Sequence, residues 1–204
     1  MSTNAGNETP TLLAMVGRLT GAATRLLIVF GLLALLGNAA AQFEVNGIIE
    51  GTVDGEARTW YTLAFDSDQG PDGTAWLRDY GNEYFTMVLL DVQAHDEPRY
   101  KTEGTLTIGG SLTQDLADCP CTLGEPDIMY FASGSMFSNV YVTIEAELVI
   151  ESATAAEDGT VLLTGTFTGL LGFVADALQG ADPDGERAIT VAGTFSLDRV
   201  LWGE

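Results

Sequence analysis

The sequence is short of the residues that most often carry catalysis. Its 204 residues include one histidine, His95, one lysine, Lys101, and two cysteines. A Ser-His-Asp or Cys-His device would depend on His95, and no Gly-x-Ser-x-Gly elbow accompanies it. Because His95 lies in a polar connection between predicted strands, we expect it to be a solvated loop residue. The three or four N/S ligands of a usual zinc site cannot be assembled without carboxylates.

Basic residues are scarce as well. The chain has 8 Lys and Arg against 29 Asp and Glu, and the part after residue 41 has a net charge of −22. A phosphate-binding face needs clustered Lys and Arg, so nucleic acid and anionic lipid headgroups are excluded as partners. The negative charge does not exclude divalent cations or basic proteins as partners. The simpler alternative is that the carboxylates keep the protein hydrated and soluble.

Long apolar runs are rare too, and the one that stands out is Leu26–Leu36. It follows Arg18 and Arg25 and leads into small residues ending at Ala41. Charge, apolar core and small residues in this order are typical of a secretory signal peptide. We therefore predict a signal peptide over residues 1–41 and a secreted or periplasmic protein.

Two membrane-bound alternatives follow from the same segment. A transmembrane anchor would need about 20 apolar residues, which Leu26–Leu36 with its Ala-rich extension does not reach. A lipoprotein would need a cysteine after the cleavage site, where this chain has Gln42, so no lipid anchor is expected. An uncleaved leader would be the remaining membrane contact. Residues 42–204 have the length of a single domain with one core.

Hydrophobic residues in this domain recur with period two, which is typical of antiparallel strands half-buried against one core. In the segment Tyr141–Ser152, Val142, Ile144, Ala146, Leu148 and Ile150 share one predicted face. Similar runs are Phe43–Val53, Arg58–Phe65, Tyr84–Val92, Gly104–Leu112, Thr160–Leu171 and Ala188–Arg199, with weaker ones at Thr74–Arg78 and Asp127–Phe131. The pattern predicts an all-β antiparallel β-sandwich, jelly-roll or Greek-key like, of about eight to ten strands. A small closed β-barrel, including an eight-stranded outer-membrane barrel, is the alternative.

Turn signals separate these runs. Asp54-Gly55, Asp158-Gly159 and Asp184-Gly185 each place a glycine where a hairpin needs positive φ. Phe173–Leu178 is the one segment with room for a turn or two of helix inside a loop.

A short echo marks the last third, where Gly165-Thr166-Phe167-Thr168 resembles Gly193-Thr194-Phe195-Ser196. In both copies we expect the phenylalanine to point inward and the hydroxyls outward. The echo therefore predicts a repeated strand environment rather than a repeated active site. Gly47, Gly51, Gly165 and Gly193 occupy inward positions, where a missing side chain permits bends, bulges or close sheet approach.

With its N-terminal strand, then Val53-Asp54-Gly55, Trp60, and closing strands that carry Gly-Thr-Phe, the chain resembles small exported β-sandwich proteins of uncharacterised families. Many of these are surface lipoproteins. The resemblance covers Phe43 to Trp202 and implies no site residues. The missing lipid-carrying cysteine is a departure from that pattern.

The cysteines form the segment Cys119-Pro120-Cys121. In an oxidising compartment they are predicted to close a small disulfide ring that serves as a structural clip. Thiol redox chemistry is one alternative, although no thioredoxin-like setting surrounds the pair. Capture of a soft metal together with Met129 or Met136 is the other.

Two groups of side chains are weak candidates for a site. Glu145 and Glu147 lie two apart on one strand face, a spacing that glycoside hydrolysis allows, although a solvated strand face explains them as well. The tryptophans Trp60, Trp76 and Trp202 are weak candidates for a sugar-stacking platform, with core or rim packing as the alternative.

Oxygen-rich turns are the last candidates. Asp66, Asp68, Asp72, Asp182 and Asp184 lie in glycine-bearing acidic segments and are weak Ca²⁺ ligands, while plain turn chemistry accounts for the same residues. We expect no cofactor, with Ca²⁺ as the alternative.

Together these features predict an exported, acidic, non-catalytic binding or structural module of the cell envelope or extracellular space, whose partner is a glycan or another envelope protein. A carbohydrate-active enzyme that uses surface carboxylates is the second hypothesis.

Overall fold

The computed structural model describes residues 43–67, 70–80, 87–135, 137–177 and 182–203. Eleven strands and one 3₁₀ turn form from these residues. They are β1 (Glu44–Val53), β2 (Glu56–Ser67), β3 (Gly70–Gly73), β4 (Ala75–Asp79), β5 (Val88–Ala94), β6 (Thr105–Leu112), η1 (Leu116–Asp118), β7 (Cys121–Thr122), β8 (Gly124–Phe131), β9 (Ser138–Ala155), β10 (Val161–Asp176) and β11 (Asp184–Gly203). The protein is therefore all-β.

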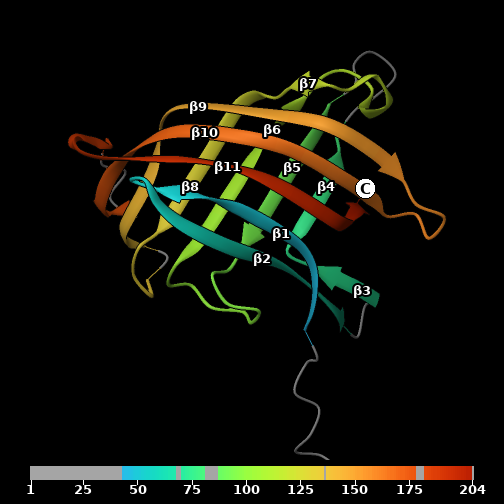
Figure 1. Ribbon diagram of the computed structural model, residues 1–204, viewed down its shortest axis with the longest axis horizontal. Coiled ribbons are helices and arrows are strands. Elements are labelled where there is room, and N and C mark those ends of the chain that lie inside the picture. The colour runs from blue at the N-terminus through green and yellow to red at the C-terminus, as the bar shows by residue number, and fades with distance from the viewer. Residues whose placement is uncertain (1–42, 68–69, 81–86, 136, 178–181, 204) are drawn as a thin grey trace, which may run out of the picture. The chain divides into compact units, whose positions relative to one another are not determined.

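The strands form two walls. One wall has the order β9-β10-β11-β1-β2-β3 and the other has the order β8-β6-β5-β4. Figure 1 shows the long strands β9, β10, β11 and β1 lying across β6, β5 and β4. Every pairing is antiparallel except that of β4 with β11, which is parallel. This arrangement is the antiparallel sandwich that the two-residue period predicts.

Hydrogen bonds also connect the walls into a ring, because β9 pairs with β8 and β11 pairs with β4. Each of these junctions has only three residue pairs, whereas β9 and β10 pair along most of their lengths. The junctions are therefore corners between two walls, and the fold is not a barrel of evenly paired strands.

One hydrophobic core fills the space between the walls. It combines Phe167 and Phe195 from the first wall with Leu77, Val92 and Ile108 from the second. Each of these side chains is at most 2% exposed. The strand β5 shows how the pattern works, because every second residue along it is buried.

All nine predicted strands are present. The structure adds the two short strands β3 and β7, which the alternation of apolar residues does not signal because they are four and two residues long. The first residues of the predicted strand Tyr84–Val92 lie outside the described residues.

The predicted inward face of β9 is wrong in its first half. Leu148 and Ile150 are buried, but Ile144 is 39% exposed. The pairing register with β10 shifts between Thr143 and Glu145, so Ile144 is an extra residue of a β-bulge. A bulge reverses which side chains face the core, and the sequence pattern does not show where it falls.

Two local predictions are also corrected. Phe173–Asp176, predicted as part of a short helix, belongs to β10 and pairs with β9; Leu178 lies outside the described residues. Gly55 and Gly159 have φ of 81° and 83°, as predicted for hairpin turns. Gly185 instead lies in β11, directly after the first residue of that strand, Asp184.

The repeated Gly-Thr-Phe motifs pair with each other. Gly165 lies opposite Phe195, and Phe167 lies opposite Gly193, because β10 and β11 run antiparallel with Thr166 and Thr194 at the centre. Each phenylalanine ring covers the glycine of the other motif: a Cβ on Gly193 would lie 2.8 Å from Cε1 and Cζ of Phe167. The echo is thus a reciprocal packing unit in the core, as a repeated strand environment requires.

No helix in the described ranges is long and apolar enough to cross a bilayer.

Candidate functional site

The structure separates the three tryptophans that were considered as a stacking platform. Trp60 is fully buried in the core, and its Nε1 donates a hydrogen bond of 2.9 Å to the Gly104 carbonyl oxygen. It therefore cannot stack on a ligand, and that assignment is wrong. The reason lies in the tertiary structure, because the Gly104 carbonyl that accepts from Trp60 belongs to the connection between β5 and β6, 44 residues away in the sequence.

Trp76 and Trp202 do share one concavity. We name it the stacking hollow: it has a volume of about 250 Å³ and is lined chiefly by Trp76, Asp158, Thr160, Arg199, Leu201 and Trp202. Trp202 is 43% exposed and Trp76 is half-buried. The parallel pairing of β4 with the end of β11 brings these two residues together from distant parts of the sequence.

The polar lining of the stacking hollow comes from Asp158 and Arg199. Asp158 accepts hydrogen bonds from Thr160 Oγ1 at 2.6 Å and from the Thr160 N–H at 3.0 Å. These bonds, with a smaller contribution from the charge of Arg199, hold the pKa of Asp158 below its usual value. In the described part of the chain, the Arg199 Nε is buried without a hydrogen-bond acceptor. The hollow thus combines aromatic faces, a carboxylate and a guanidinium group.

Sequence reasoning did not select Asp158 or Arg199 as site residues. In the sequence, Asp158 was interpreted as part of an Asp-Gly turn, and in the structure it also has this role. Arg199 is one of only six basic residues after residue 41, and that scarcity is the signal that could have drawn attention to it.

A second concavity also has Trp202 in its lining. This end hollow, about 330 Å³ in volume, is lined by Leu116, Ala153, Val161 and Trp202 among others. Its lining is more apolar than that of the stacking hollow. The two hollows share Gly159, Thr160 and Trp202, so they lie next to each other.

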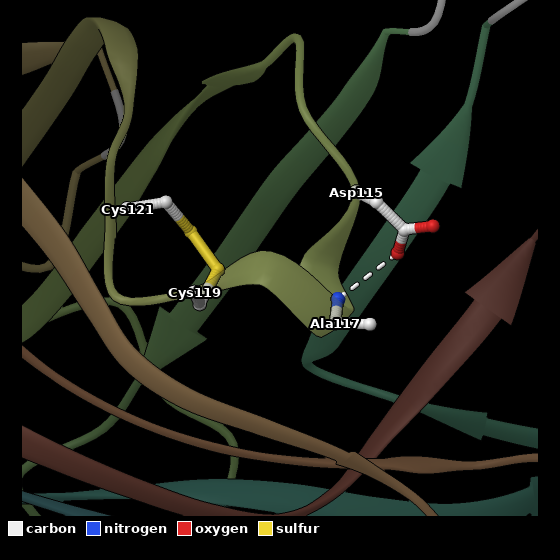
Figure 2. Close-up of a disulfide and its surroundings, with 4 residues drawn as sticks. All are labelled: Asp115, Ala117, Cys119 and Cys121. Atoms are coloured by element: carbon white, nitrogen blue, oxygen red, sulfur yellow. Dashed lines mark hydrogen bonds between the residues drawn. A yellow bond between two sulfur atoms is a disulfide. The ribbon is translucent and has the colours of Figure 1, made fainter.

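The turn η1 forms one side of the end hollow. Asp115 caps it by accepting a hydrogen bond of 2.9 Å from the Ala117 N–H, and the disulfide Cys119–Cys121 follows directly (Figure 2). Cys121 also pairs with Ile150 of β9. The disulfide therefore ties the capped turn to the long strand β9, in agreement with a structural clip. Of the two methionines considered as soft-metal ligands, Met129 is half-buried in β8 and Met136 lies outside the described residues.

The candidate catalytic pair Glu145 and Glu147 lies on the outward face of β9, and both residues are exposed. They line a broad hollow of about 480 Å³ together with Thr168, Gly169 and Thr190. Glycosidases hold their carboxylates on both sides of the scissile bond in a cleft that encloses the sugar and admits the attacking water. This surface has the right residue type but not that enclosure.

Three of the candidate Ca²⁺ ligands, Asp66, Asp72 and Asp184, lie in strands rather than in open loops. Asp66 and Asp72 belong to the paired strands β2 and β3. Asp72 accepts a hydrogen bond of 2.7 Å from the Gly73 N–H, and Asp184 accepts one of 2.9 Å from the Glu186 N–H. Asp182 is exposed, and Asp68 lies outside the described residues. Among the residues described, no three His, Cys, Asp or Glu side chains are grouped to hold a metal ion.

The expected solvation of His95 is wrong, because the residue is 0% exposed. Its polar neighbours in the sequence suggested a loop in water. In the fold, however, His95 pairs with Tyr61 of β2 through backbone hydrogen bonds, so it lies against the other wall instead of in water.

Fold and site together define the class as an acidic, two-walled antiparallel β protein with an aromatic hollow between the ends of β4 and β11. No family model matches the sequence, and no curated protein or solved structure shows significant similarity to it. The function is therefore argued from the geometry of the site.

Proposed function

We propose that this protein is an exported, non-catalytic module that binds a neutral glycan in the stacking hollow. The observation that carries the proposal is the convergence of Trp76, Trp202 and Arg199 on one concavity. The leader-like segment ending at Ala41 supports export, and the acidic composition fits a partner that is not a polyanion.

The aromatic pair supports a sugar as the ligand. A pyranose ring presents C–H groups on its faces and hydroxyls around its edge. Indole rings bind such faces through apolar contact, while a few polar groups at the rim set the orientation. Here Trp76 and Trp202 offer the apolar contact, and the charged side chains of Arg199 and Asp158 supply polar groups in the same hollow.

The charge balance supports a neutral rather than an acidic sugar. Asp158 lines the same hollow as Arg199, and its pKa is lowered partly by the Arg199 charge, so the two charges offset each other. An anionic sugar would also approach a domain whose net charge is −22. Because a neutral glycan carries no charge whose attraction salt could screen, its binding should depend little on ionic strength.

The test is a glycan array followed by calorimetry with the neutral oligosaccharide that binds best. We expect Trp202→Ala to weaken binding at least about tenfold, equivalent to about 1.4 kcal/mol. The matched control is Phe137→Ala, which removes an aromatic side chain that is 54% exposed and lines neither hollow. Equal affinities for the two variants, or selection of only acidic glycans, would contradict the proposal.

The non-catalytic part is tested with the same ligand in a reducing-sugar assay. Binding without turnover supports a module, whereas turnover that is lost in Glu145→Gln would establish the enzyme hypothesis instead.

Export is tested by mass spectrometry of the protein from an expressing cell. We expect the mature chain to begin near Gln42, and recovery of the protein with its leader still attached would contradict export.

A further inference from the structure

His95 lies in a segment that joins the two walls at a separate place from the stacking hollow. We name the segment His95–Gly104 the strap. At its start, His95 exchanges two backbone hydrogen bonds with Tyr61 of β2, of 2.7 and 2.9 Å. At its end, the Gly104 carbonyl accepts the indole N–H of Trp60, the neighbouring residue of β2. Both ends of the strap are therefore tied to β2.

The hydrogen bonds of the imidazole determine which nitrogen would take a proton. Nδ1 lies 2.6 Å from the Lys101 carbonyl oxygen and 3.1 Å from Thr105 Oγ1. The Lys101 N–H also lies 3.4 Å from Nδ1, but the contact with the carbonyl is much shorter and a carbonyl oxygen can only accept, so Nδ1 carries the hydrogen in the neutral ring. Nε2 then has the lone pair, and in the described part of the chain this buried atom has no hydrogen-bond partner. A proton taken up from solvent must go to Nε2.

Protonation at that atom is incompatible with the closed strap. It would place a charged donor in a fully buried position without an acceptor, which is among the costlier arrangements in a protein interior. Burial accordingly lowers the pKa of His95. The Lys101 carbonyl and the charge of Asp96 oppose this by raising the pKa, and the charge of Lys101 lowers it further.

The other titratable groups of the strap are Asp96, Glu97, Arg99, Tyr100, Lys101 and Glu103. Lys101 forms ion pairs with Asp96 at 2.6 Å and with Glu97 at 3.2 Å. These contacts lower the pKa of Glu97 and raise that of Lys101, so both stay charged in mild acid. The Tyr100 ring lies 4.9 Å from the imidazole.

The strands packed against the strap contribute one charged group from the described residues, Arg58 of β2, whose charge acts to lower the pKa of Tyr130. Their other polar groups near the strap are hydroxyls. From β2 comes Tyr61, from β6 the hydroxyl of Thr105, and from β8 Tyr130, whose pKa is raised by burial.

We propose that His95 makes the strap acid-sensitive: in mild acid the imidazole takes a proton at Nε2, and the strap separates from β2 while the paired β9, β10 and β11 stay folded. The neutral ring favours the closed strap. This contribution is complete above the pKa of a free imidazole, about 6.5, and is lost as the pH falls below that value toward the lower pKa of the closed form. The site in the stacking hollow plays no part in this inference.

The test is amide hydrogen exchange of the whole protein at about pH 7.5 and about pH 5.5, corrected for intrinsic rates, a range in which free carboxylates stay charged. We expect protection of Tyr61 and the strap to fall at least about tenfold at the lower pH, and protection of Phe167 in β10 to stay constant. The control is His95→Asn, whose amide can still donate to the Lys101 carbonyl but cannot titrate. It should keep the strap protected at both pH values.

Equal acid-induced loss in His95→Asn, or no loss in the unmodified protein, would overturn the proposal. Should His95→Asn fail to fold, the unmodified protein still decides. Since His95 is the chain's only histidine, its imidazole gives a single NMR signal that can be titrated directly. A midpoint at or above about 6.5 would overturn the proposal, because a closed strap requires a lowered pKa.

Discussion

Substituting Gly193 by alanine should destabilise the protein through the reciprocal Gly-Phe packing of β10 and β11. The added Cβ would lie 2.8 Å from Cε1 and Cζ of Phe167 and 2.5 Å from the Glu50 carbonyl oxygen, well inside ordinary van der Waals distances. The ring of Phe167 is 1% exposed and cannot turn into solvent. Either β11 or the ring must therefore shift.

The size of the effect follows from two opposing contributions. Overpacking a well-filled core costs about 1–3 kcal/mol. Replacing glycine by alanine also restricts the unfolded chain, which stabilises the folded state by about 0.4–1 kcal/mol. We therefore expect a net loss of about 1–2 kcal/mol for Gly193→Ala. It should appear as a lower urea midpoint at an unchanged m value in equilibrium unfolding.

A double-mutant cycle identifies the cause. In a Phe167→Leu background the Cβ has more room, so Gly193→Ala should cost about 1 kcal/mol less than it does alone, with the Glu50 carbonyl accounting for the remainder. The control is Gly134→Ala, because a Cβ there would meet no atom within 4 Å and the residue does not have positive φ. The reasoning is refuted if Gly193→Ala is as stable as the control, or if the two core substitutions are strictly additive.

Two further predictions concern the connections of β8 and η1 to β9. Thr143→Val should lower stability by about 1–3 kcal/mol in urea unfolding. The Thr143 hydroxyl accepts a hydrogen bond from the Ile128 N–H at 2.6 Å and donates one to the Ile128 carbonyl at 2.9 Å, and valine can make neither. An unchanged urea midpoint would show that these two bonds add nothing to stability. Replacing Cys119 and Cys121 by serine should lower stability by no more than about 1.6 kcal/mol, because the loop that the disulfide closes is so short. A loss above about 4 kcal/mol would contradict a purely local clip.

The alternation of apolar and polar residues predicted all nine of the longer strands, because side-chain period is a local property of an extended chain. The bulge at Ile144 was not predictable, since an extra residue changes the facing of a strand without changing its composition. The same limit applies to β3 and β7, which are too short to show a period.

The candidate site was predicted in part. Trp76 and Trp202 were named, but Trp60 was named with them, because an indole ring in the sequence looks the same whether it packs in a core or lines a surface. Exposure separates them: Trp202 is 43% exposed and Trp60 is 0% exposed. Asp158 and Arg199 were missed because each also has an ordinary local interpretation, as a turn residue and as a strand residue.

The sequence by itself determined that this is an acidic, antiparallel β protein, where most of its strands lie and which cysteines are close enough to pair. These features depend on residues that are near one another along the chain. Only the tertiary structure decided that Trp60 and His95 are buried and that Trp76 and Trp202 line one hollow. Such outcomes depend on which strands become neighbours across long separations, and that is settled by packing the two walls around a single core.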